Sequence, residues 1–346
     1  MISNHKSYRS FLLSIRLAYY TEKISDPKLI DKSNHDLYDA HHKPLPQSWE
    51  TDFINEHVPA RCRHCGSPDI RKQGYTRSGI QRYYCSRCGR TFTPLTGTLF
   101  DSHKLAIDEW VEYLLDLIHY QSFNATSREN RNSINTTRYW DDKLFIALKD
   151  IGKDMILSGD VYIDETYVDV KVEERLHDED GMRLRGISRS QWCIAIGCDS
   201  GHVYCMVEGK GHPSIKRTWD AFGKQIQPGS ILIHDGEYSH SVLVDRLSLE
   251  SRVYISTDTK GLPDNKNPLN PINTQCRFLK RFLRMHSGYN TDNLQDLLNL
   301  FMVIADCSHN EYEKVQFILS RMISTPVVVK YPRKRPQYHT NNSDNA

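Results

Sequence analysis

The sequence predicts a mixed α/β protein that carries a cysteine-rich module near its N-terminus. Two Cys-x-x-Cys pairs lie close together within residues 58–100. From Val161 onward, short runs of β-branched residues replace the helical periodicity before them, first as three consecutive strands and then alternating with helices. A chain of 346 residues has room for one large domain and one or two small ones.

The composition argues against several classes of protein. The net charge is only +2, so any binding to nucleic acid must depend on local clusters of charge. No apolar run approaches the roughly 20 residues of a membrane helix, so no membrane partner is expected. Five cysteines are dispersed outside the module, and this odd remainder indicates a reducing compartment, the cytoplasm, and not a disulfide framework.

The N-terminal half divides into three segments. Residues 1–57 are polar and are predicted to form an arm or linker, and residues 58–100 hold the cysteine module. Three helices with tight turns are predicted in residues 101–157, the first capped by Asp101 and Ser102, and this arrangement is typical of a helix-turn-helix unit. A plain helical spacer is the alternative interpretation.

The C-terminal half contains the predicted sheet, in residues 158–310. Residues 311–346 are predicted to form a helix and then a basic, disordered tail. Strands are expected at 161–170, 191–198, 203–207, 230–234 and 253–256. Helices are expected at 213–222, 239–247, 270–285 and 291–304.

The spacing of the paired cysteines predicts a structural zinc site. Cys62 and Cys65 are separated from Cys85 and Cys88 by 19 residues, enough for a hairpin that brings two tight knuckles together. Four thiolates fill the tetrahedral coordination of Zn²⁺, so this site leaves no open position for catalysis. His64 lies inside a knuckle and is interpreted as a bystander.

The module is also strongly basic, which is typical of a surface that binds a phosphate backbone. Between residues 61 and 92 there are eight Lys or Arg residues and one acid, Asp69, a net charge of +7. Binding to a protein partner is the alternative. The basic residues are Arg61, Arg63, Arg71, Lys72, Arg77, Arg82, Arg87 and Arg90.

Two carboxylates end or interrupt predicted strands. Asp164 follows three strand-like residues, and Asp235 directly follows an apolar run. Carboxylates on adjacent strands are how proteins hold hard divalent cations, and two such cations support phosphodiester chemistry. Other acids compete for these two roles: Glu165, Asp160 and Asp169 with Asp164, and Glu237 with Asp235.

A third ligand is expected from the helix at 270–285, where Asn273 is the best candidate. Helical spacing puts Asn273 on one polar face together with Arg277, Lys280, Arg281 and Arg284. Such a basic face beside a metal site would bind DNA phosphates, and a merely solvated helix face is the alternative. The nearby histidines His234, His240 and His286 are interpreted as hydrogen-bonding partners and not as ligands.

With these residues in place, the chain resembles the bacterial insertion-sequence transposases in which a zinc ribbon precedes a DDE-type catalytic domain, a group related to the Merlin transposons. The matching stretches occur in the same order, from about Cys62 to about Cys307. They are the ribbon with Phe92-Thr93-Pro94-Leu95-Thr96-Gly97-Thr98, the Trp110 helix, Ile163-Asp164-Glu165-Thr166-Tyr167, Ile196-Gly197-Cys198-Asp199, His234-Asp235-Gly236-Glu237, Ile272-Asn273, Leu279-Lys280-Arg281 and Asn293-Leu294-Gln295-Asp296.

The resemblance implies an RNase H-like fold for residues 158–310 and a catalytic set of Asp164, Asp235, Asn273 and Lys280. Asn273 departs from a strict DDE pattern, because its neutral amide oxygen is a weaker ligand than a carboxylate. The implied reaction is DNA cleavage followed by strand transfer, with two Mg²⁺ or Mn²⁺ ions held by the two aspartates and Asn273. The implied partners are the terminal inverted repeats and target DNA, bound by a homodimer at the nucleoid.

Two other functions remain open on the sequence alone. The first is an RNase H-like nuclease that cuts DNA without joining it. The second is a catalytically impaired DNA-binding protein derived from a transposase, an interpretation that Asn273 keeps open.

Overall fold

The computed structural model describes residues 48–101, 103, 106–169, 177, 179, 182, 191–286 and 291–331. The chain divides into two units, residues 1–45 and residues 46–346. The predictions made for residues 1–47, and for the tail at 332–346, lie outside the described residues.

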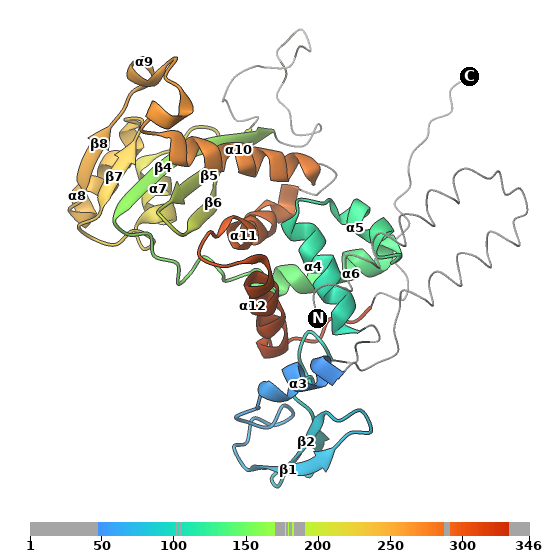
Figure 1. The fold of residues 1–346 in the computed structure, drawn as a ribbon. Coiled ribbons are helices and arrows are strands. Elements are labelled where there is room, and N and C mark those ends of the chain that lie inside the picture. The colour runs from blue at the N-terminus through green and yellow to red at the C-terminus, as the bar shows by residue number, and fades with distance from the viewer. Residues whose placement is uncertain are drawn as a thin grey trace, which may run out of the picture. The chain divides into compact units, whose positions relative to one another are not determined.

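The cysteine module is a small antiparallel sheet with a helix beside its hairpin (Figure 1). Strands β1 (Ile70–Tyr75), β2 (Gln81–Cys85) and β3 (Thr91–Phe92) pair in that order. Helix α3 (Ser48–Glu56) precedes them, and Asn55 on α3 both accepts from the Gln81 N–H at 2.8 Å and donates to the Gly79 carbonyl at 3.0 Å. The last residues of the predicted arm are therefore bonded to the module.

Three helices follow, as the sequence predicts: α4 (Ile107–Ile118), α5 (Phe123–Glu129) and α6 (Ile134–Leu148). Trp110 of α4 stacks on Trp140 of α6, with ring centroids 4.2 Å apart and planes 19° from parallel. Helix α12 (Glu311–Ser324) packs against both α4 and α6. The C-terminal helix thus joins the core of the predicted helical segment.

The predicted cap of the first helix is wrong. Helix α4 begins at Ile107 after Ala106, not after Asp101 and Ser102, and Ala106 has no capping side chain. The Ile107 N–H instead donates to the Glu50 carboxylate of α3, at 3.3 Å, and the Glu50 side chain is fully buried. A carboxylate stabilises a helix N-terminus by accepting from a free N–H, wherever it lies in the sequence. Glu50, 57 residues before Ile107, therefore takes the place of a local capping residue.

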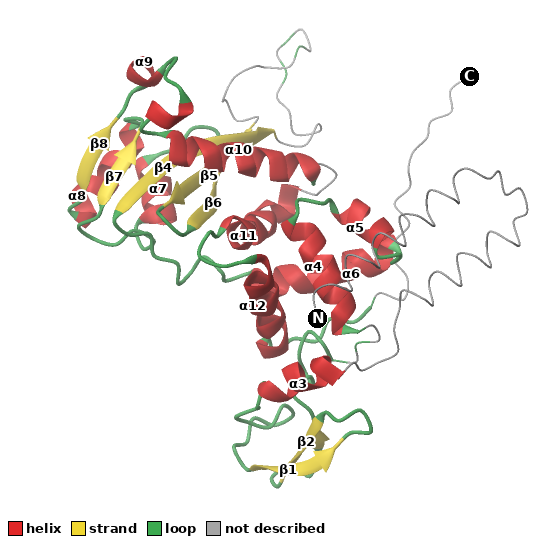
Figure 2. Cartoon of the chain, in the orientation of Figure 1, coloured by secondary structure: helices red, strands yellow, loops and turns green. Residues whose placement is uncertain are grey.

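The larger sheet confirms the predicted mixed α/β class (Figure 2). Its strand order is β6-β5-β4-β7-β8. Strand β4 pairs antiparallel with β5, and β5 with β6, whereas β4, β7 and β8 are parallel. The strands are β4 (Asp160–Asp169), β5 (Gln191–Cys198), β6 (Val203–Lys210), β7 (Ile231–His234) and β8 (Glu250–Val253).

Helices pack on this sheet, and its strand β5, which lies between β6 and β4, is buried from Cys193 to Cys198. Helix α10 (Asn270–Met285) packs against β4 and β5, and α11 (Leu294–Ala305) packs against β6. Helix α7 (Ile215–Phe222) contacts β6 and α8 (Ser241–Leu247). The apolar residues of β5 predict this burial, because a strand that is hydrophobic on successive residues needs a cover on both faces.

The last predicted strand is displaced from its observed position. The sequence predicts 253–256, whereas β8 spans Glu250–Val253 and Ser256–Thr259 form the short helix α9. Strand β8 pairs in parallel with β7, residue for residue from Ile231 to His234. Because β7 ends at His234, residues beyond Val253 have little further backbone to pair with, and the β-branched residues there are exposed.

Among the described residues, no helix is both long enough and apolar enough to cross a membrane.

Leu232 is fully buried in the middle of β7, between β4 and β8. We expect Leu232→Ala to lower the free energy of unfolding by about 2–5 kcal/mol, because it leaves a cavity in a packed core. Ile215→Ala, at a 40% exposed position, should cost within about 0.5 kcal/mol. Chemical denaturation of the two variants measures both; equal losses would contradict this packing.

Candidate functional site

The parallel pairing of β4 with β7 brings two of the predicted ligands to the same level of the sheet. In this register Tyr162 lies opposite Ile233. Asp164 is two residues after Tyr162, and Asp235 is two residues after Ile233, so the same register sets the two aspartates opposite each other. Asp235 is the first residue after β7 and is exposed, whereas Asp164 lies within β4 and is largely shielded.

The Asp164 carboxyl group lies in an environment that opposes its negative charge. Burial raises its pKa to about 6, and the charges of Glu165 and Asp235 add to that effect. Two donors act in the opposite direction: the Glu165 N–H at 2.8 Å from Oδ1, and the Cys276 thiol at 3.6 Å from Oδ2. The group is therefore a shielded carboxylate beside two others, an arrangement that a cation would stabilise.

Three of the four predicted catalytic residues line one pocket of about 360 Å³. They are Asp164 from β4 and Asn273 and Lys280 from α10. Asp235 is not part of the lining, but its charge acts on Asp164. The remaining lining residues are Glu165, Asp264, Asn270, Cys276 and Arg277.

Helix α10 presents its polar face as predicted from helical spacing. Its buried residues are Ile272, Cys276, Leu279 and Phe282, and Pro271 lies in its first turn. The face away from these residues carries four exposed cations: Arg277, Lys280, Arg281 and Arg284.

Two of these cations have contacts within the chain. Arg277 donates to the Asp264 carboxylate at 3.3 Å, a pair that is exposed on both sides. The Arg281 guanidinium lies over the Tyr120 ring, 5.9 Å from its centroid. Neither contact buries the charge, so both side chains are still available to a polyanion.

The competing acids are separated from the pocket or otherwise bonded. Asp160 and Asp169 are the two exposed end residues of β4. The Glu165 side chain is 6% exposed and its Oε1 lies 2.9 Å from His240 Nε2. The Glu237 N–H donates to Asp235 Oδ1 at 3.0 Å, so this residue supports the turn through its backbone.

A buried histidine network accompanies the two aspartates. His234 and His240 act as hydrogen-bonding partners, as the sequence analysis predicted, but the bond between them and the bond from His240 to Glu165 were not predicted. His240 Nδ1 lies 3.0 Å from His234 Nδ1, and His234 Nε2 lies 3.1 Å from Ser251 Oγ. Burial and the charge of His240 lower the pKa of His234 to about 4. Burial, the largest single effect, opposes the charged form of His240, but the bond to Glu165 and the charges of Glu165, Asp235 and Glu237 together outweigh it and raise the His240 pKa. Cys276 also escaped prediction; its position one helical turn after Asn273 was the available signal.

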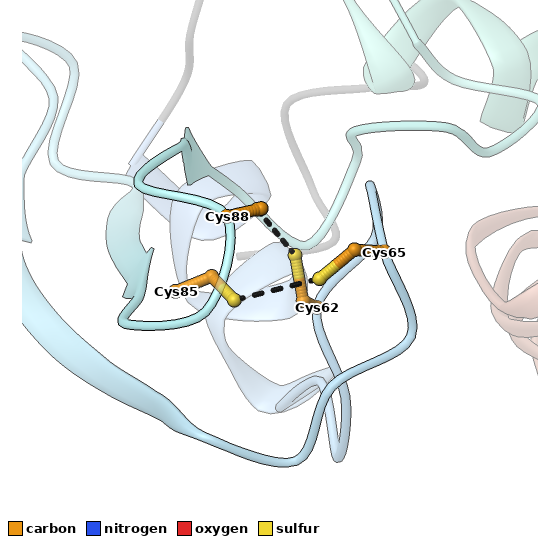
Figure 3. A group of neighbouring side chains, drawn as sticks. All are labelled: Cys62, Cys65, Cys85 and Cys88. Atoms are coloured by element: carbon orange, nitrogen blue, oxygen red, sulfur yellow. Dashed lines mark hydrogen bonds between the residues drawn. The ribbon is translucent and has the colours of Figure 1, made fainter.

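The four module cysteines converge in the geometry that a tetrahedral zinc ion needs. Their ligand atoms all lie within 4.8 Å of one another. Figure 3 shows Cys62 facing Cys88 and Cys65 facing Cys85, with Sγ–Sγ distances of 3.7 and 3.6 Å. Sulfurs held at about 2.3 Å from one zinc lie about 3.8 Å apart, whereas a disulfide requires about 2.05 Å. The four residues therefore fit a zinc ion and not a pair of disulfides.

The two knuckles share one backbone conformation. The Gly66 N–H donates to the Cys62 carbonyl, and the Gly89 N–H donates to the Cys85 carbonyl, both at 2.9 Å. Both glycines have positive φ, 72° and 67°, which explains why glycine follows each pair. His64 Nε2 lies 3.2 Å from the Thr91 carbonyl, so this ring bonds to backbone outside the sulfur cluster.

The basic residues of the module lie on its surface, with one exception. Arg63 is half-buried, its Nε has no hydrogen-bond partner, and burial lowers its pKa. It is therefore less accessible than predicted for DNA contact. The Arg71 guanidinium stacks over the Tyr84 ring at 5.0 Å. The seven exposed cations are Arg61, Arg71, Lys72, Arg77, Arg82, Arg87 and Arg90.

Comparison with known proteins supports the resemblance found in the sequence. The chain is 25% identical over 254 residues to an uncharacterised protein in the transposable element ISH50 of Halobacterium salinarum, covering 70% of this chain and 84% of that protein. The chain resembles insertion-sequence proteins. The resemblance that its motifs predicted is thereby confirmed. No family model matches the chain.

Solved structures of a transposase also align with the chain, but only loosely. The catalytic domain of Mos1 mariner transposase shares 12% identity, with a TM-score of 0.28 over 54% of this chain and 89% of that one. A Mos1 mariner paired-end complex with Mn also shares 12% identity, with a TM-score of 0.21 over 61% and 78% of the two chains. At these TM-scores the alignment carries no structural conclusion.

The hydrophobic cluster that contains the module's metal-binding cysteines has only four buried members, Cys62, Tyr83, Cys85 and Phe92, so this part of the fold should depend on the metal. We expect one zinc per chain in purified protein, and none in Cys85→Ser. Cys307→Ser, at an exposed cysteine outside the cluster, should keep the ion. Elemental analysis measures both, and a zinc content unchanged by Cys85→Ser would contradict the site.

Proposed function

We propose that this chain is an insertion-sequence transposase that cleaves DNA at the element's ends and transfers the freed strand to target DNA. One observation carries the proposal. The register of β4 and β7 sets Asp164 beside Asp235, and the pocket at Asp164 also contains Asn273 and Lys280. Oxygen ligands and a lysine in one solvent-open pocket are the groups that phosphoryl transfer requires.

Asp164 and Asn273 of this pocket, together with the neighbouring Asp235, fit a pair of divalent cations, Mg²⁺ or Mn²⁺. Asp164 is largely shielded from solvent and lies near the like charges of Glu165 and Asp235, so a cation bound there would neutralise part of this negative charge. Asp164, Asp235 and the Asn273 amide oxygen would hold the ions. Bound there, they would activate the attacking oxygen and stabilise the leaving one.

The protein's own part in the reaction is to bind and orient the DNA. Lys280 is exposed in the pocket lining, where its ammonium group can contact the phosphate beside the scissile bond. Arg281 and Arg284 extend the positive charge along α10 and would hold the flanking backbone. Positioning and charge neutralisation of this kind need no covalent link between protein and DNA.

The remaining segments would bind the element's ends. The zinc ribbon, residues 58–100, offers seven exposed cations, and α4 to α6 form a compact helical unit with the short turn typical of helix-turn-helix domains. Residues 158–310 would be the RNase H-like catalytic domain, in keeping with the mixed order of its five strands. Since two ends must be joined, we expect a homodimer on DNA.

A nuclease that cuts without joining is the second candidate, because the same pocket serves hydrolysis. A protein that binds DNA without cutting it is a third candidate, because the amide of Asn273 is a weaker metal ligand than a carboxylate. Incubating the purified chain with a duplex of the element's end and a plasmid target separates the three. Joined products support the transposase, nicks alone support the nuclease, and intact DNA supports the impaired protein.

Asp164→Asn should reduce cleavage of the end duplex by at least about 10³-fold, because it removes a metal-binding charge at the reacting atoms. Binding to the same duplex should stay within about threefold. Gel assays of cleavage and binding measure the two effects on one preparation.

Asp160→Asn is the matched control, since Asp160 lies on the same strand but at its exposed first position. It should cleave like the unmodified chain. Equal losses in both variants, or residual cleavage by Asp164→Asn near the normal rate, would show that the site is assigned to the wrong acid.

Charge on the ribbon should determine affinity for any duplex, whatever its sequence. We expect the double change Arg71→Gln and Lys72→Gln to weaken binding uniformly, and to flatten the dependence of log K on log salt by about 0.9 per lost phosphate contact. The double change Lys216→Gln and Lys224→Gln removes the same charge from exposed positions elsewhere and should leave that slope unchanged. Equal slopes for the unmodified chain and both double variants would show that the ribbon does not contact DNA.

A further inference from the structure

One buried imidazole bonds to the immediate neighbours of both aspartates. His240 Nε2 lies 2.9 Å from Oε1 of Glu165, the residue after Asp164. His240 Nδ1 lies 3.0 Å from Nδ1 of His234, the residue before Asp235. The His240 side chain has no exposed surface, and that of Glu165 is 6% exposed.

The donors in this network can be assigned from its geometry. The Gly236 N–H donates to His234 Nδ1 at 3.2 Å, so this nitrogen is an acceptor. His240 Nδ1 must then be the donor in its own bond to the same nitrogen. His240 Nε2 faces a carboxylate oxygen and donates there, so His240 uses both of its ring N–H groups.

Strand geometry makes these two bonds a constraint on the aspartates. Neighbouring side chains on a strand point to opposite faces, so Glu165 and Asp164 project in opposite directions from β4. Asp164 bonds to Cys276 of α10, whereas Glu165 bonds to His240 in the turn before α8. A link from Glu165 to His234 therefore fixes how far the ends of β4 and β7 can shift relative to each other.

The alternative, that His234, Asp235 and His240 bind a metal ion of their own, fits the structure less well. Their ligand atoms lie within 4.8 Å of one another. However, each of the four ring nitrogens already lies within hydrogen-bond distance of another group: Glu165, Ser251, the Gly236 N–H or the partner histidine. No nitrogen lone pair is left to face an ion.

We propose that His240 is a positioning residue that sets the spacing of Asp164 and Asp235 by holding Glu165 and His234 together. The proposal rests on the proposed function, in that the two aspartates are taken to share divalent cations. Partners that orient metal ligands in this way typically account for about 10- to 100-fold in metal affinity.

Mn²⁺ titration of the full chain by calorimetry tests this role. His240→Gln can keep the bond to Glu165, and His240→Asn can keep the bond to His234. Each variant therefore breaks one of the two bonds of His240 and leaves the other possible. Both should bind Mn²⁺ about 10- to 100-fold more weakly than the unmodified chain, with unchanged stoichiometry and at temperatures where they are folded.

His286→Asn is the matched control. His286 is also buried and bonds to the Phe282 carbonyl, so its replacement can lower the melting temperature but should leave Mn²⁺ affinity within about twofold. If both His240 variants bind Mn²⁺ with an affinity within about twofold of that of the unmodified chain, the positioning role is overturned and the proposed function is left intact. Loss of one whole ion would make His240 a ligand and would also overturn it. Absence of Mn²⁺ binding by the unmodified chain would refute the proposed function, and the role of His240 with it.

Discussion

The parallel pairing of β4 with β7 is the interaction on which the candidate site depends. Three register pairs, from Asp160 with Ile231 to Tyr162 with Ile233, determine that Asp164 and Asp235 lie at one level. Both strands are anchored by fully buried residues, Val161 and Leu232, which face each other in this register. A slip of one residue would turn every side chain of a strand to the opposite face, so the same packing that stabilises the sheet also keeps the two carboxylates in register.

Packing alone does not explain the polar groups placed around these carboxylates. A buried acid beside like charges costs free energy unless a cation or hydrogen-bond donors compensate for it. Here Asp164 receives the Glu165 N–H and the Cys276 thiol, and Glu165 receives His240. The fold therefore compensates for part of the negative charge and leaves the rest in an open pocket, which is the arrangement that a divalent cation would complete.

The cysteine module uses a different source of stability. With few buried side chains of its own, it depends on the sulfur cluster to hold its two knuckles together. Because the interior is so small, most side chains of β1 are exposed, and the positive charges there can face a polyanion without disturbing a core. Because so few positions are needed for a core, metal-binding residues and basic residues can alternate within a short stretch of sequence.

The sequence by itself determined the features that depend on local spacing: the four cysteines and their knuckle glycines, the polar face of α10, and strands such as Gln191–Cys198. It also identified Asp164 and Asp235 as residues in or directly after strands. Only the tertiary structure decided that Asp164 shares a pocket with Asn273 and Lys280, that Glu50 caps α4 from α3, and that His240 links Glu165 to His234. These contacts join residues far apart along the chain, and no periodicity reports them, because they depend on which strands pair and in which register.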